Sequence, residues 1–164
     1  MNILIHSNHQ GILNIKLPYM EGEGDGENAI CDMQSGLRIQ PLGPHTMAQV
    51  LAKELHDYLK GRCVRFSDYP LVWDGITDFE KKVLLGLGDI PYGQTSSYGE
   101  LAGRLGFPRA ARAVGQALKR NPWPVLIPCH RIIGKEGGLR GFSSGSAWKS
   151  ILLRIEKSLE EVPG

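Results

Sequence analysis

The stretch "NPWPVLIPCHRII", residues 121–133, restricts the backbone more than any other part of this 164-residue sequence. Proline fixes its own φ, lacks an amide N–H and keeps the residue before it out of helical backbone. Three prolines in so short a segment therefore make it stiff and disfavour a helix. The segment places Cys129 directly before His130, so the chain must be built around a rigid turn that fixes the position of one thiol.

The chemistry of this thiol depends on its neighbours. The nucleophilic form is the thiolate, and an ordinary cysteine with a pKa of roughly 8.5 is mostly protonated at neutral pH. Successive side chains diverge in an extended segment, so a tight turn after Pro128 is needed to bring Cys129 and His130 together. Glu156 could then orient the imidazole and complete a Cys-His-Glu relay. On spacing alone, an inert buried cysteine is the commoner alternative.

Residues 1–75 predict a small lobe made of a sheet and one helix. Apolar residues occur at every second position on either side of Gly11, which indicates a hairpin; they are Ile3 and Ile5, then Leu13, Ile15 and Leu17. Weaker strand signals lie at residues 29–33 and 37–40, after an acidic, glycine-rich loop at residues 21–28. Thr46 and Gln49 have the spacing of a capping box, which predicts a helix that Gly61 ends.

Residues 76–164 predict a mostly helical lobe, so the expected fold class is α+β. Two further capping boxes, Thr77 with Glu80 and Ser97 with Glu100, each indicate a helix start. Pro108 suits the first position of the next helix, which is expected to run to about residue 120. A last helix is expected over residues 148–159, where apolar residues share one face.

Charge is distributed unevenly between the two halves. The formal net charge is only +2, but residues 1–75 contain 6 Lys and Arg against 9 Asp and Glu, and residues 76–164 contain 13 against 8. An anionic partner such as nucleic acid would prefer the second half. Chance variation of surface charge is the alternative.

Residues 97–120 have the layout of a helix-turn-helix, a short helix and a second helix joined by a turn with glycine. At about 100° per residue, the second helix divides into an apolar face and a basic face. The basic face carries cations that can neutralise phosphates, among small residues that allow a close approach; it comprises Arg109, Arg112, Gln116, Lys119 and Arg120 with Ala113 and Gly115. An ordinary solvated amphipathic helix fits the same pattern.

Cysteine use and hydropathy exclude several classes of protein. Three scattered cysteines argue against a disulfide framework, nothing favours a bridge between Cys31 and Cys63, and no CxxC or Cys/His cluster indicates a metal site. No secretory signal is evident, and no apolar run approaches the roughly 20 residues of a membrane span. We therefore expect a cytoplasmic protein with no membrane contact, nuclear if the source is a eukaryote.

The segment "PCHRII", preceded by "NPWPVLI" and followed by "GGLRGFSSG", resembles the active-site signature of the O6-alkylguanine-DNA alkyltransferases. The resemblance extends upstream through "IPYGQTSSYGELAGRLGFPRAARAVGQALKRNP" and covers roughly residues 76–157. It implies DNA repair by irreversible, single-turnover transfer of an alkyl group from guanine O6 to a cysteine. The implied partner is double-stranded DNA carrying alkylated bases, the implied protein is a monomer, and no cofactor or metal is needed.

The resemblance implies a role for each matching residue. Cys129 matches the alkyl acceptor, His130 the base that removes its proton through a water, and Glu156 the acid that orients the histidine. Asn121 matches the brace of the active-site turn, and Tyr98 the hydroxyl that acts at guanine N3. Residues implied in holding the substrate base or its alkyl group are Ile132, Ser143, Phe142, Pro124 and Trp123.

The same resemblance assigns the basic helix to the minor groove of DNA. Arg112 matches the arginine that fills the gap left by a flipped-out nucleotide. A groove about 6 Å wide explains the small residues beside it. The implied DNA-binding set is Arg112, Ala110, Ala111, Ala113, Gly115, Arg109, Gln116 and Lys119.

The sequence departs from the family pattern at two positions. Phe142 stands where some relatives carry tyrosine, so a hydroxyl there is not essential here. Arg140 occupies a position that is small in some relatives, which puts bulky alkyl groups in doubt. Two other functions fit parts of the pattern: a non-catalytic sensor of alkylated bases, whose known examples lack the cysteine, and a Cys-His hydrolase, which would not need Arg112.

Overall fold

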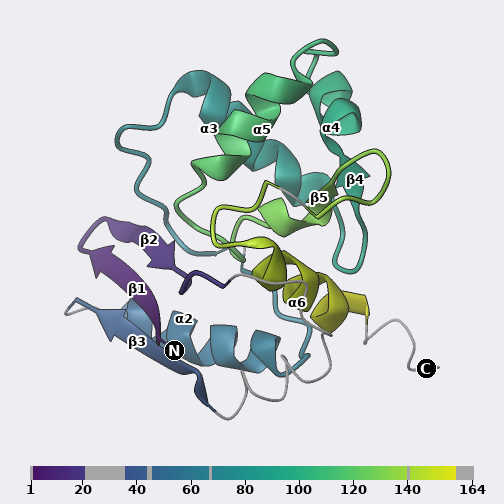
Figure 1. The fold of residues 1–164 in the computed structure, drawn as a ribbon. Helices are drawn as coiled ribbons and strands as arrows, with labels where there is room; N and C mark the ends of the chain where they lie inside the picture. Colours follow the sequence, from purple (N-terminus) through teal and green to yellow (C-terminus); the bar gives the residue numbers. More distant parts are fainter. Residues whose placement is uncertain (1, 21–35, 44–45, 67, 140, 158–164) are drawn as a thin grey trace.

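The structure is a computed structural model, and it describes residues 2–20, 36–43, 46–66, 68–139 and 141–157 (Figure 1). Several expectations fall outside these ranges: the loop at 21–28, the strand signal at 29–33, and residues Cys31, Arg140 and Leu159. Within the described part of the chain, no helix is long and apolar enough to cross a membrane.

The first lobe is a three-stranded sheet with one helix beside it. Strand β1 (Asn2–Asn8) lies between β2 (Gly11–Lys16), its antiparallel partner, and β3 (Arg38–Leu42), which runs parallel to it. Helix α2 (Thr46–Leu59) packs against β1 and β3 with Leu51 and Leu55 fully buried. The α+β fold class is therefore confirmed (Figure 1).

The expected alternation of buried residues in the second strand is wrong at one position. Ile12 is fully buried, whereas Leu13 is 36% exposed. Ile5 pairs with Ile15, but the next pairs are His6 with Asn14 and Ser7 with Ile12, so Leu13 is an extra residue with no partner on β1. Such a β-bulge shifts the pattern by one residue, and a period of two cannot reveal it.

Both capping boxes of the second lobe are confirmed. Thr77 Oγ1 accepts a hydrogen bond from the Glu80 amide, and Glu80 accepts one from the Thr77 amide, at the start of α3 (Asp78–Leu85). Ser97 and Glu100 make the same pair of bonds at the start of α4 (Tyr98–Arg104). A short 3₁₀ helix, η1 (Gly86–Asp89), follows α3.

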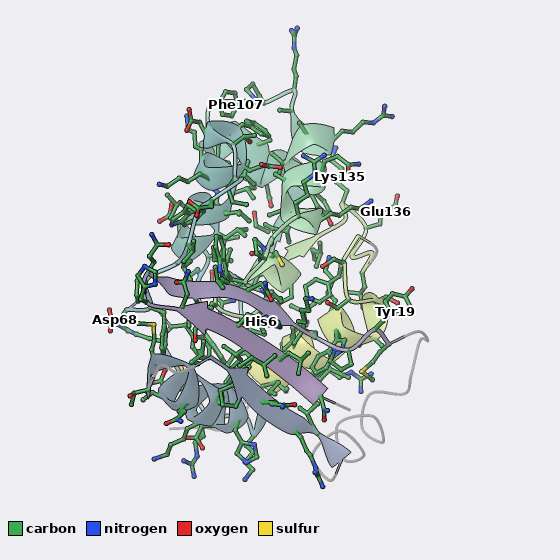
Figure 2. The ribbon with its side chains drawn as sticks, turned by 90° about the vertical axis from the view of Figure 1, so that its left-hand side faces the viewer. His6, Tyr19, Asp68, Phe107, Lys135 and Glu136 are labelled. Carbon is green, nitrogen blue, oxygen red and sulfur yellow. The ribbon has the colours of Figure 1, made fainter. Side chains whose placement is uncertain are left out.

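The next helix, α5 (Ala111–Lys119), begins later than expected, because Pro108 lies in a turn and not at the first helical position. Gly106, with φ +84°, and the bond from the Phe107 amide to Ala102 O end α4. The Ala110 amide then bonds to Phe107 O, which makes Pro108 the second residue of a β-turn, a position that proline also favours. Figure 2 shows Phe107 at the end of the molecule remote from the sheet.

The chain around the cysteine joins the two-helix unit to the rest of the protein. Cys129–Arg131 forms a 3₁₀ turn, η2, and β5 (Ile132–Ile133) then pairs in parallel with β4 (Ser96–Ser97), directly before α4. Helix α6 (Ser146–Lys157) packs against η2. It begins two residues earlier than expected.

The two lobes share one continuous hydrophobic core. The Trp123 indole N–H donates to Ile12 O at 2.9 Å, and the Ile15 amide donates to Pro122 O at 2.8 Å. These bonds hold β2 of the first lobe against the segment that leads to the cysteine. The position of the thiol therefore depends on both lobes.

Candidate active site

Asn121 holds the proline-rich turn from inside. Its side chain is buried, and its Nδ2–H group donates to Ile127 O at 3.0 Å and to the sulfur of Cys129 at 3.2 Å. Its Oδ1 accepts from the Trp123 amide at 2.9 Å. One amide side chain thus joins the two ends of the turn to each other and to the thiol.

The same turn contains a strained residue. Val125 has φ +77° and is 3% exposed. A β-branched residue in left-handed backbone costs about 1–3 kcal/mol, and such strain persists only where surrounding contacts impose it. Here the Ile127 amide bonds to Trp123 O at 2.9 Å around Val125, so the strained turn is held closed just before the cysteine.

Cys129 is 7% exposed, and burial raises the pKa of its thiol to about 11. The Asn121 hydrogen bond and the positive charge of Lys149 oppose this rise. The thiol is therefore protonated at neutral pH in the free protein. Nucleophilic attack requires a base that removes the proton at the moment of reaction.

His130, the next residue, is fully buried and has the chemistry to act as such a base. Its Nε2 lies 2.8 Å from Oε1 of Glu156. Burial lowers the pKa of His130, so the ring is neutral, and the carboxylate can only accept. The proton must therefore sit on Nε2, which leaves the lone pair on Nδ1. That nitrogen is buried, and it has no hydrogen-bond partner in the described part of the chain.

Glu156 receives more donors than the sequence suggested. Arg131 donates from Nε to Oε2 and from Nη2 to Oε1, both at 3.0 Å, and the Gly93 amide donates to Oε2 at 3.1 Å. Tyr58 of α2 donates to Oε1 at 2.6 Å. Burial opposes ionisation of Glu156, but the donors from His130, Arg131 and Tyr58 hold its pKa below the ordinary value.

Lys149 also lies in the site, and its burial there was not expected from the sequence. It is 1% exposed, and burial lowers the pKa of its ammonium to about 8. Its Nζ lies 5.8 Å from the centre of the Tyr98 ring. A helical projection could have revealed this burial, because Lys149 shares one face of α6 with Leu152 and Glu156, at spacings of three and four residues.

Tyr98 lies between the basic helix and the loop that follows β5. A Cβ on Gly115 of α5 would be 3.6 Å from the Tyr98 ring, and a Cβ on Gly141 would be 2.9 Å from its hydroxyl. Gly141 also has φ +94°, so a side chain at this position would both crowd the Tyr98 hydroxyl and strain the backbone. Burial raises the pKa of Tyr98, which keeps its hydroxyl protonated and able to donate.

A cavity of about 430 Å³ opens beside the turn, between the two lobes. Its walls include Pro124, Ser143 and Asn121, together with residues 14–17 of β2 and the segment after it. Phe142, which directly precedes Ser143, is half-buried and packs against the hydrophobic core. The cavity thus brings Pro124 and Ser143 of the expected substrate set together with a strand of the first lobe.

Three members of the expected substrate set are buried, namely Pro124, Trp123 and Ile132. Trp123 is fully buried, with its ring 4.7 Å from that of Trp73 and its N–H bonded to Ile12, so it supports the turn from behind. The Ile132 side chain is also fully buried, and its backbone pairs with Ser96 in the short parallel sheet. Only its backbone groups can face a ligand.

The exposed face of α5 and of the turn before it carries the expected DNA-binding set. Arg109, Arg112, Gln116 and Lys119 are exposed, as is Ala113, while Ala110, Ala111 and Gly115 are half-buried. Val114, Ala117 and Leu118 are buried on the opposite face. Arg120 differs from the other cations, because it forms an ion pair with Glu80 of α3 at 2.9 Å.

No group of three or more His, Cys, Asp or Glu side chains in the described ranges is arranged to hold a metal ion. The chemistry that the described residues can perform includes proton transfer and nucleophilic attack. Cys129 offers a thiol, Nδ1 of His130 a buried lone pair able to accept a proton, and Tyr98 a protonated hydroxyl on the side of the basic helix.

Comparisons with known proteins identify the family of this chain. The sequence family described as "6-O-methylguanine DNA methyltransferase, DNA binding domain" matches residues 78–158. A protein of Methanosarcina barkeri named methylated-DNA–protein-cysteine methyltransferase is 47% identical over 107 residues, which are 65% of this chain and 66% of the relative. The constitutive methylated-DNA–protein-cysteine methyltransferase of Bacillus subtilis is 45% identical over 106 residues, 64% of this chain and 63% of the relative.

The aligned segment thus spans just under two thirds of the length of these curated relatives. A structural match covers more of the chain. The crystal structure of Mycobacterium tuberculosis OGT in complex with DNA superposes with a TM-score of 0.72 and 32% sequence identity, over 96% of this chain and 94% of that one. The resemblance found in the sequence is therefore confirmed, and this chain belongs to the methylated-DNA–protein-cysteine methyltransferase family.

Proposed function

We propose that the protein repairs DNA by direct reversal. In this proposal it transfers the alkyl group of O6-alkylguanine, and of O4-alkylthymine, to Cys129, irreversibly and once per molecule. The observation that carries the proposal is the buried arrangement in which Asn121 binds the Cys129 sulfur and Glu156 binds His130. The names of the relatives supply the substrate class, methylated DNA, and the acceptor, a protein cysteine.

The proton of the thiol needs a path, since the pKa of Cys129 is raised to about 11. The unpartnered Nδ1 of His130 is the acceptor at the end of that path. A water between Sγ and Nδ1 would receive the thiol proton and pass one to the imidazole. Glu156 would then stabilise the imidazolium, which explains why a carboxylate is buried against this histidine.

The transfer step is a displacement at the alkyl carbon. The thiolate forms the new S–C bond, the C–O bond to the base breaks, and its electron pair is delocalised into the purine. Tyr98 stabilises that developing charge by a hydrogen bond or a proton at N3. A donor placed in advance in a buried site is the most effective way to stabilise such charge.

The target atom lies inside a duplex, so the nucleotide has to leave the stack. The exposed face of α5, with small residues at Ala113 and Gly115, suits a close approach to the minor groove. Arg112 would fill the gap that the flipped nucleotide leaves. Arg109 and Lys119 would contact phosphates, since neither forms an ion pair within the described part of the chain.

A titration tests this function. Duplex DNA with one O6-methylguanine is added in excess to wild-type protein and to a Cys129→Ala variant. The expected result is that restored guanine reaches a plateau at one per wild-type molecule and that the variant restores none. Repeated turnover would identify a hydrolase, and tight binding without any restored guanine would identify a sensor of alkylated bases.

A further inference from the structure

Tyr58 connects the first lobe to the proposed catalytic relay. It lies on α2, 1% exposed, and its hydroxyl donates to Glu156 Oε1 at 2.6 Å. The same hydroxyl oxygen is 3.4 Å from Nε2 of His130. Residues separated by 72 and 98 positions in the sequence therefore meet around one carboxylate oxygen.

This contact is specific to one of the two carboxylate oxygens. Oε1 receives Tyr58, His130 Nε2 and Arg131 Nη2, whereas Oε2 receives Arg131 Nε and the Gly93 amide. Tyr58 thus competes with the imidazole for the acceptor that holds it. Because a shared acceptor binds each donor less strongly, the Tyr58 hydroxyl limits how well Glu156 can stabilise a protonated His130.

We propose that Tyr58 is a positioning residue of the alkyl-transfer site, whose hydroxyl fixes Glu156 Oε1 and sets the basicity of His130. This inference rests on the proposed function. It gives the first lobe a role in the chemistry, because a helix of that lobe supplies one of the donors to the relay. Tyr58 acts through Glu156 and does not touch the sulfur.

Other charged or titratable groups face this cluster and define the background against which Tyr58 acts. Arg131 and Lys149 both supply positive charge that opposes protonation of His130 and lowers its pKa. Tyr92 packs edge-on to Tyr58, with ring centres 6.1 Å apart, and Cys129 precedes the histidine. Removing only the Tyr58 hydroxyl leaves all of these groups in place.

The substitution Tyr58→Phe isolates the hydroxyl, since phenylalanine keeps the ring contacts with Phe66 and Tyr92. A matched control is Tyr69→Phe. Tyr69 also donates to a glutamate, Glu54 Oε2 at 2.7 Å, but this pair has no contact with the relay. Both variants therefore lose one tyrosine–glutamate hydrogen bond.

The experiment measures the single-turnover rate of transfer from O6-methylguanine in duplex DNA as a function of pH. Without the competing donor, Oε1 binds His130 more strongly and the pKa of the imidazole rises. Since the neutral ring is the base, the acidic limb of the Tyr58→Phe profile should move up by about half to one pH unit. Below that limb the rate should fall several-fold, and Tyr69→Phe should match the wild type.

A second measurement keeps the inference testable if Tyr58→Phe folds poorly. Incorporation of 3-fluorotyrosine at position 58 preserves the hydrogen bond and makes the hydroxyl a stronger donor, so the acidic limb should move down. Profiles for both replacements that overlay the wild type would overturn the role of Tyr58. Absence of any transfer by the wild type would instead overturn the proposed function, so the two failures are distinguishable.

Discussion

Asn121 Nδ2 lies 3.2 Å from the sulfur of Cys129, and the same side chain accepts a hydrogen bond from the Trp123 amide. The asparagine therefore holds the strained turn and at the same time offers a hydrogen bond to the thiolate. This donor lowers the pKa of Cys129, against the rise that burial causes. The link between backbone geometry and thiol chemistry passes through this one side chain.

Asn121→Asp removes the Nδ2–H group, which bonds both Ile127 O and the sulfur of Cys129. A carboxylate still accepts from Trp123, but it replaces the Nδ2–H donor with negative charge beside the sulfur. Because like charges disfavour each other's ionisation, the pKa of Cys129 should rise further and transfer should slow by about tenfold or more. Single-turnover rates at pH 7 and pH 9 check this, and an unchanged rate would contradict the role given to Nδ2.

Lys149→Met should make the protein more stable and less reactive. The pKa of Lys149 is lowered from 10.5 to about 8, so the unfolded chain binds more protons between these values. Unfolding free energy should therefore rise from pH 8 to 10.5 more in the wild type than in the variant. At pH 7 the variant should be more stable, by on the order of 2 kcal/mol, because no ammonium is buried.

The rate of alkyl transfer by Lys149→Met is the second quantity to measure. The ammonium of Lys149 favours the thiolate of Cys129, so its removal should slow alkyl transfer. Denaturant unfolding across the pH range and single-turnover rates give both quantities. A variant that reacts as fast as the wild type would show that Lys149 does not assist the thiol.

Glu80 holds α5, the helix proposed to bind DNA, through its ion pair with Arg120. Its hydrogen bonds to Thr77 and Arg120 lower its pKa from 4.5 to about 2. A lowered pKa contributes stability that is present above 4.5 and lost as the pH falls towards 2.

Glu80→Gln should therefore cost about 1 kcal/mol at pH 7 and weaken the loss of stability between pH 4.5 and 2. Glu100→Gln is the control, since Glu100 caps α4 but forms no ion pair within the described part of the chain. Denaturant unfolding at a series of pH values measures both variants. Identical acid sensitivity in Glu80→Gln and the wild type would exclude the ion pair as a source of stability.

Arg112→Ala should slow repair of a modified base in duplex DNA more than reaction with the free base. Arg112 is exposed on α5 and is proposed to fill the gap in the stack, which exists only in DNA. Lys53→Ala removes one exposed positive charge from α2 in the other lobe and serves as the control. Equal losses on duplex and free base would remove the stacking role from Arg112.

Local rules in the sequence predicted the parts of the fold that depend on neighbouring residues. The capping boxes at Thr77 and Ser97 are examples, because both partners lie within four residues of each other. The bulge at Leu13 and the turn at Pro108 were mispredicted, since each depends on a choice between two local structures that the same residues allow.

The residues of the site that belong to a sequence motif were predicted, and those that only the tertiary fold brings to the site were missed. Cys129, His130 and Glu156 were expected together, and the structure brings His130 and Glu156 into contact. Tyr58 has no motif of its own, and it reaches Glu156 only because α2 packs against the second lobe. Arg131 belongs to the motif, but its two bonds to Glu156 were not foreseen.

Alkyl transfer by the proposed route leaves the sulfur of Cys129 covalently and permanently alkylated. The most direct test is the mass of the wild-type protein and its peptides after incubation with duplex DNA containing O6-methylguanine. We expect each chain to gain one methylene unit of mass, located on the peptide that contains Cys129. An unchanged mass while the DNA is repaired, or a gain located on Cys63, would contradict it.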